Sequence, residues 1–108
     1  MSGKLLFVSG QIGWDKNGTL ADGLPAQFAL ALQNILAVVI EAGGNSEHIA
    51  RMTIFIKDKK QYEEQRKEIG SRYRALMGKH YPAMSLLVVK DLLEDGALVE
   101  IEATAVLP

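Results

Sequence analysis

The chain has 108 residues, of which 48% are hydrophobic and 23% are charged, and its formal net charge is -1 at pH 7. A chain of this length is expected to form a single domain, residues 1–108, and its near-neutral charge opposes a nucleic-acid partner. Because the chain contains no cysteine, disulfides, thiolate nucleophiles and thiolate metal sites are excluded.

The first predicted strand covers residues 5–12, a short segment rich in branched and aromatic residues. Gly10 inside this strand indicates a bulge or a close backbone approach, and the turn residues 15–18 follow it. The apolar stretch after Lys4 is far too short for a signal peptide or a membrane span. We therefore expect a cytoplasmic protein with no membrane partner.

Two helices are predicted from apolar residues that recur at helical spacing. The first begins at Pro25, which suits a first helical turn, and ends at the glycines 43–44. A short turn capped at residues 45–46 comes next. The second helix follows Asp58, stops between residues 78 and 82, and has highly charged outer faces. Its apolar stripe consists of Tyr62, Ile69, Tyr73, Leu76 and Met77.

Three further strands complete the predicted order. Residues 52–56 carry apolar side chains on both faces, and residues 85–89 form a continuous apolar run. The pair Asp95-Gly96 predicts a hairpin-type turn into a last strand at residues 98–106.

The order β-α-β-α-β-β predicts an α+β fold, in which two helices cover one face of a mixed sheet. The other face of the sheet still carries apolar side chains, which a single chain of this size cannot cover. We therefore expect a closed homo-oligomer.

Three motifs extend this interpretation. They are Ser9-Gly10-Gln11-Ile12, Pro82-Ala83-Met84-Ser85, and Val99-Glu100-Ile101-Glu102-Ala103-Thr104-Ala105. Together they resemble the RidA/YjgF family of reactive intermediate imine deaminases, over residues 6 to 106. The resemblance implies a chorismate-mutase-like fold, a homotrimer with a barrel-like centre, and a small-molecule ligand in each cleft between subunits.

The resemblance implies that Glu100 holds the water that attacks an imine carbon. Spacing alone says less: Glu100 and Glu102 share one face of a strand, roughly 6.5 to 7 Å apart along it, and both could lie on a solvated or interface face. Ser9 and Gly10 match the strand that lines the family pocket, where a glycine lets a ligand approach closely. Ser85, which follows Met84 in the second motif, is a further candidate ligand-binding residue.

Met84 departs from the family pattern, which has an arginine two residues after the proline to clamp the substrate carboxylate. A thioether offers neither charge nor donors, and losing one charge-assisted hydrogen bond costs roughly 1.5 to 3 kcal/mol. Affinity for a carboxylate-bearing imine should then fall by about one to two decades or more. Arg66, where the family often has asparagine, could reach into the cleft, or its stem could pack while its head stays in water.

A second departure is at the start of the chain. Only eight residues precede Ser9, whereas the family usually has an additional N-terminal strand. We expect a more open pocket, or one covered by another subunit.

We expect no metal and no cofactor, because His48 and His80 are isolated and lack the spacing of metal ligands. Positive and negative charges alternate around residues 57–67, which opposes an RNA-binding stripe.

Three functions are consistent with the sequence. The first is an enamine/imine deaminase acting on a substrate that residue 84 does not clamp. The second is a non-catalytic ligand-binding trimer of the same family. The third is an endoribonuclease or translation inhibitor, which the net charge opposes.

Overall fold

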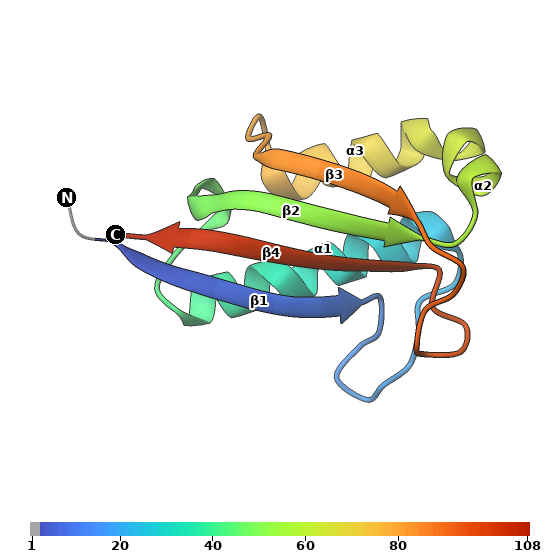
Figure 1. Ribbon diagram of the computed structural model, residues 1–108, viewed down its shortest axis with the longest axis horizontal. Helices are drawn as coiled ribbons and strands as arrows, with labels where there is room; N and C mark the ends of the chain where they lie inside the picture. The colour runs from blue at the N-terminus through green and yellow to red at the C-terminus, as the bar shows by residue number, and fades with distance from the viewer. Residues whose placement is uncertain (1–2) are drawn as a thin grey trace.

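The structure, a computed structural model, describes residues 3–108 and consists of one four-stranded sheet with helices packed on it (Figure 1). The strands are β1 (Lys4–Ile12), β2 (Ile49–Ile56), β3 (Ala83–Val88) and β4 (Val99–Leu107). The helices are α1 (Leu24–Glu41), the short 3-10 turn η1 (Ser46–His48), α2 (Lys59–Glu64) and α3 (Arg66–Met77).

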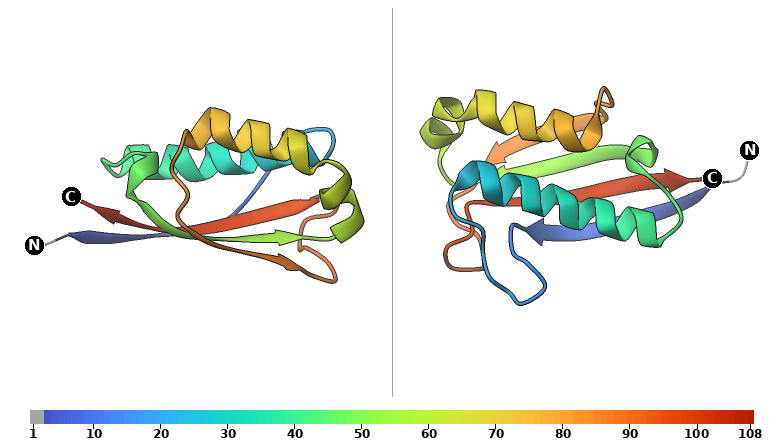
Figure 2. Two further views of the ribbon diagram at one scale, coloured as in Figure 1. Left: turned by 90° about the horizontal axis from the view of Figure 1, so that it is seen from above. Right: turned by 180° about the vertical axis from the view of Figure 1, so that it is seen from behind.

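The strand order in the sheet is β1-β4-β2-β3. β4 runs antiparallel to both of its neighbours, whereas β2 and β3 are parallel and are connected through α2 and α3. Figure 2 shows α1 and α3 on the same side of the sheet. The predicted α+β fold, with helices on one face of a mixed sheet, is confirmed.

The hairpin predicted at Asp95-Gly96 is wrong. β3 lies at an edge of the sheet and β4 lies in its interior, with β2 between them. The turn belongs to a longer connection, residues 89–98, that carries the chain past β2. Alternate residues along the whole length of β4 are buried, so one of its faces packs on the core, and the strand pairs with β1 on one side and β2 on the other.

The second predicted helix is two helices. Asp58 does begin the helical segment, since its Oδ1 accepts a hydrogen bond from the backbone N–H of Gln61 at 3.0 Å. The helix breaks at Gln65, whose backbone angles are φ -109° and ψ 12°, and α3 starts at the next residue. The break sets the direction of α3, which buries Ile69, Tyr73 and Met77.

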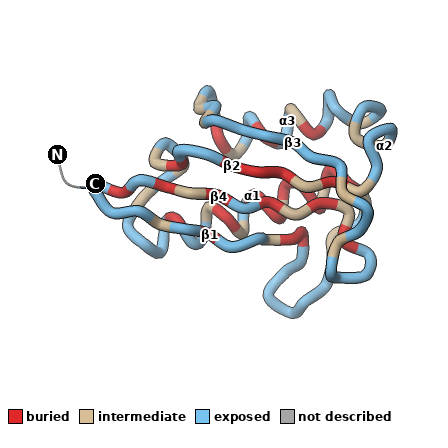
Figure 3. The backbone as a smooth tube through the Cα atoms, in the orientation of Figure 1, coloured by how far each residue is buried: buried red, intermediate tan, exposed pale blue. Residues whose placement is uncertain are grey.

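The core lies between the helices and the sheet (Figure 3). Leu32, Ile35 and Val39 of α1 are fully buried, as is Ile101 of β4. Each such side chain contributes roughly 1.5–3 kcal/mol through burial. α1 is long and apolar enough to span a membrane by length and composition, but 56% of that window is buried in the fold, as in a core helix. The expected cytoplasmic location stays a prediction.

The sheet face opposite the helices is uncovered in the single chain, and we call it the open face. Its members are identified by the strand register, which pairs Phe7 with Thr104, Thr53 with Glu102, and Phe55 with Glu100. The open face carries Leu5 and Phe7 of β1, Arg51, Thr53 and Phe55 of β2, and Glu100, Glu102, Thr104 and Val106 of β4. Phe7 is 75% exposed, so this face carries apolar surface as expected.

Gln27 joins the loops at the end of the sheet where β1 stops and β4 starts. Its side chain is buried, and its Nε2 donates to the carbonyl oxygens of Ala21 and Gly96, both at 3.1 Å. Its Oε1 accepts from the backbone N–H of Leu98 at 2.8 Å. These bonds fix the first residues of β4, next to Glu100, on the core helix.

Candidate functional site

Glu100 lies on the open face against the backbone of β1. A Cβ at Gly10 would collide with its carboxylate and would fall 2.8 Å from Cδ. The pairing of β1 with β4 also shifts between Val8 and Gln11, so Gly10 lies in a bulge and at a close approach together. Within residues 3–108 the Glu100 carboxylate makes no hydrogen bond or ion pair, which leaves its oxygens available to a water or a ligand.

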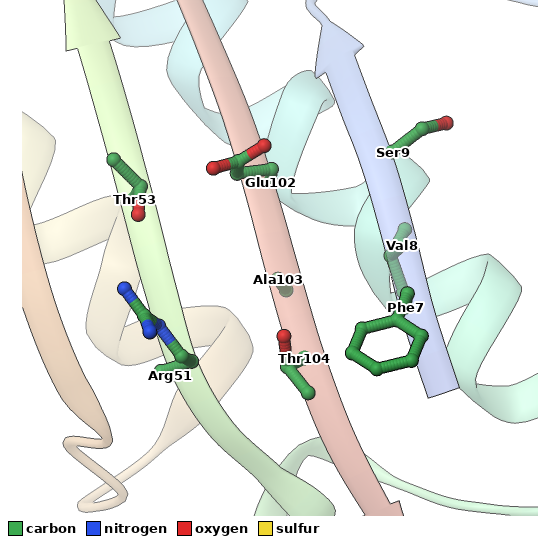
Figure 4. A pocket seen from close by; sticks show the side chains of 8 residues that line it. All are labelled: Phe7, Val8, Ser9, Arg51, Thr53, Glu102, Ala103 and Thr104. Carbon is green, nitrogen blue, oxygen red and sulfur yellow. The ribbon is translucent and has the colours of Figure 1, made fainter. Parts of the chain in front are cut away.

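A hollow of about 420 Å³ lies on the open face beside Glu102 (Figure 4). Ser9, a predicted site residue, is in its lining. The other lining residues are Phe7, Val8, Arg51, Thr53, Glu102, Ala103 and Thr104. Figure 4 shows Arg51 and Glu102 on neighbouring strands, so the hollow offers a cation, a carboxylate and two threonine hydroxyls.

A second hollow, of about 440 Å³, lies between β3 and the helices, and we call it the helix-side hollow. Met84 and Arg66 both line it, so the structure brings these two predicted residues together. The other lining residues are Phe28, Ile54, Tyr62, Ile69, Gly70, Tyr73, Arg74 and Tyr81.

Two stacked tyrosines form part of the helix-side hollow. The ring centroids of Tyr73 and Tyr81 are 5.2 Å apart, and the Tyr73 hydroxyl donates to the carbonyl oxygen of His80 at 2.7 Å. Burial, with a smaller contribution from Tyr81, raises the pKa of Tyr73 to about 12. Tyr73 therefore stays protonated at neutral pH and acts as a fixed donor.

Met84 and Glu100 lie on opposite faces of the sheet. Met84 pairs in register with the core residue Met52, whereas Glu100 pairs with Phe55 on the open face. β2 also lies between β3 and β4 in the sheet. Ser85 pairs with Thr53 and so belongs to the open-face side. One chain therefore does not gather all the predicted site residues around one cavity.

Several residues of the two hollows were absent from the sequence predictions. Arg74 is two helical turns after Arg66 with Gly70 midway, a spacing that places all three on one face of a helix and could have been noticed. The sequence did not indicate that Arg51 and Thr53 line a hollow, because they lie near Glu102 only as a result of the pairing of β4 with β2.

The two histidines make local structural contacts. Nδ1 of His48 accepts from the backbone N–H of Asn45 at 2.9 Å and completes a capping box. Nε2 of His80 lies 2.8 Å from the carbonyl oxygen of Ile49. Within residues 3–108, no three acidic or histidine side chains gather as metal ligands would.

Comparison with known sequences gives matches over almost the whole chain. The family model described as endoribonuclease L-PSP matches residues 1–107. The chain is 34% identical, over an alignment of 108 residues, to the 2-iminobutanoate/2-iminopropanoate deaminase of Salmonella typhimurium, covering 96% of this chain and 80% of that relative. It is 36% identical over 102 residues to a RutC family protein of Aquifex aeolicus, covering 94% and 79%.

Solved structures show the same fold. The TdcF protein of Escherichia coli, solved with bound serine, superposes with a TM-score of 0.83 at 32% identity, covering 98% of this chain and 86% of that one. The YjgF gene product of Escherichia coli gives a TM-score of 0.83 at 32% identity, covering 96% and 81%.

Proposed function

This chain belongs to the RidA/YjgF family, the family described as endoribonuclease L-PSP, and from that membership we propose that it hydrolyses a small enamine or imine. The observation that carries the proposal is the placement of Glu100 against Gly10, where its carboxylate lies beside exposed backbone of β1 and makes no hydrogen bond within residues 3–108. A deaminase name among the relatives supports the reaction class.

The chemistry requires little beyond a positioned water and a proton acceptor. Water adds to the C=N carbon, its proton passes to the Glu100 carboxylate, and the nitrogen takes up protons and leaves as ammonia. The carbon retains the water oxygen as a carbonyl. An enamine reaches the same product after tautomerising to the imine. Glu102, two residues further along the same face, is a solvated neighbour without a role in this scheme.

The proposal places the complete site between subunits of a homotrimer. A ligand that touches both Met84 and Glu100 needs two chains, because the two side chains lie on opposite faces of the sheet in one chain. The exposed apolar residues of the open face, Phe7 among them, supply a surface for that assembly. That the proposed oligomer has three subunits is taken from the family resemblance.

The proposed substrate differs from one held by a carboxylate clamp at residue 84. Met84 is 41% exposed and lines the helix-side hollow with a thioether, which provides apolar contact but no donor. The same observation favours one alternative, a trimer that binds a ligand in the cleft without turning it over.

Ammonia release from freshly generated 2-aminoacrylate tests the reaction. We expect a slow rate for the wild-type protein, loss of that rate in Glu100→Ala, and a gain in Met84→Arg. Glu102→Ala is the matched control and should keep the wild-type rate. Activity that survives Glu100→Ala would remove Glu100 from the mechanism.

Ligand binding without ammonia release from any imine would instead favour the non-catalytic alternative. Specific cleavage of RNA at a rate that Glu100→Ala does not change would contradict both, and the net charge of -1 opposes it.

A further inference from the structure

The helix-side hollow has two arginines on α3, and we propose that Arg66 and Arg74 together bind an oxyanion of the ligand, in place of the cation that is absent at Met84. The inference rests on the proposed function only in placing the substrate in the helix-side hollow. Anion binding itself can be measured without turnover.

Gly70 leaves room for the guanidinium of Arg74 at the hollow. It lies in the middle of α3, one helical turn from each arginine, where glycine is unfavourable compared with alanine. A Cβ at this position would fall 3.2 Å from Nη1 of Arg74 and 4.0 Å from its Cζ. The guanidinium of Arg74 thus lies over Gly70, on the side of the helix toward Arg66.

The charge around the hollow is of one sign. Its lining contains the two arginines and no aspartate or glutamate. Within residues 3–108 the ion pairs are Lys57 with Asp91 and Arg72 with Glu68, so neither hollow-lining guanidinium is neutralised by a carboxylate of its own chain. Two forks of N–H donors at one cavity match the geometry of a carboxylate or phosphate.

The remainder of the lining limits the shape of the ligand. Phe28, Ile54, Ile69 and Met84 provide apolar surface, and Tyr81 adds an aromatic ring. The hollow therefore fits an oxyanion joined to a small apolar body, which is bound from the helix instead of from β3.

The test is a binding titration of the full chain, followed by nuclear magnetic resonance, with three probes. The first is 2-oxobutanoate, which is the hydrolysis product of a 2-imino acid and carries a carboxylate on a short apolar chain. The second is its neutral methyl ester, and the third is inorganic phosphate. The variants are Arg66→Met, Arg74→Met and, as a control on the same helix, Arg72→Met.

We expect 2-oxobutanoate to bind and the ester to bind at least tenfold more weakly. Arg66→Met and Arg74→Met should each weaken 2-oxobutanoate by at least tenfold, about 1.4 kcal/mol, whereas Arg72→Met should not. Tighter binding of phosphate than of 2-oxobutanoate, lost in the same two variants, would assign the site to a phosphorylated ligand.

The proposal is overturned if the wild-type protein binds neither anion, or if both hollow variants bind 2-oxobutanoate as the wild type does. It is also overturned if the two variants change only the mass of the oligomer, since the arginines would then pair with a neighbouring copy. Failure of the proposed function has a different signature: anion binding that needs Arg66 and Arg74 persists, but no imine is hydrolysed.

Discussion

The space that a side chain at Gly10 would fill is occupied by the carboxylate of Glu100. The two residues come from adjacent antiparallel strands, at the point where the register of β1 against β4 shifts. The bulge and the glycine thus act together, because the shift brings β1 backbone beside Glu100 and the missing Cβ leaves room for its carboxylate.

Gly10→Ala should therefore displace the Glu100 side chain. We expect a loss of about 1–3 kcal/mol in the free energy of unfolding, the usual cost of overpacking, together with a loss of ammonia release. Glu100→Ala should make Gly10→Ala nearly neutral in stability, which a double-mutant cycle in urea measures. Additive effects of the two substitutions would mean that the contact does not constrain either residue.

Gln27→Leu should destabilise the end of the sheet next to Glu100. The substitution leaves the Leu98 N–H and the carbonyls of Ala21 and Gly96 without their buried partner, at a cost of roughly 2–4 kcal/mol. This corresponds to a fall in Tm of about 10 °C or more in a thermal melt. Gln33→Leu, on an exposed position of the same helix, is the control and should leave Tm nearly unchanged.

Tyr73 should make the folded state sensitive to alkali. Its pKa is about 12 in the folded protein and about 10 when unfolded, so the unfolded chain releases its proton first as the pH rises. The contribution of the protonated Tyr73 to the free energy of unfolding is fully present below about pH 10 and is lost as the pH approaches about 12. Ultraviolet absorbance should show one late tyrosinate, which Tyr73→Phe removes; a Tyr73→Phe titration with the late phase intact would assign it elsewhere.

Phe7→Glu should lower the mass of the assembly. Phe7 is 75% exposed on the open face, and a charge buried between subunits would be costly. Ile40→Glu, at a 63% exposed position on α1 outside that face, should leave the mass unchanged. Light scattering at micromolar concentration measures both variants, and a wild-type monomer would contradict the trimer itself.

Local patterns predicted most of the fold. The apolar spacing of α1, the helix start after Asp58 and the strand at residues 98–106 each depend on residues close in sequence, and each appears in the structure. The hairpin at Asp95-Gly96 failed because turn residues do not specify which strand lies beside which. The sequence near Gln65 did not indicate the helix break either, because α2 and α3 lie in one uninterrupted charged segment.

The structure places the predicted site residues in separate groups. Met84 and Arg66 line one hollow, and Gly10 approaches Glu100. The sequence did not indicate that Met84 and Glu100 lie on opposite faces, because that follows from the register of β3 on β2 and of β4 on β2. Arg74 was absent from the predicted site residues, although its spacing from Arg66 is visible in the sequence.

None of the six residues of the edge strand β3, Met84 among them, is buried. Because residue 84 is only half-buried at the sheet edge, exchanging its side chain should cost less free energy of unfolding than a substitution in the core. Under the proposed function, the sheet edge is a place where a single substitution changes ligand preference without a compensating change in the core. The interior strand that holds Glu100 has no such freedom.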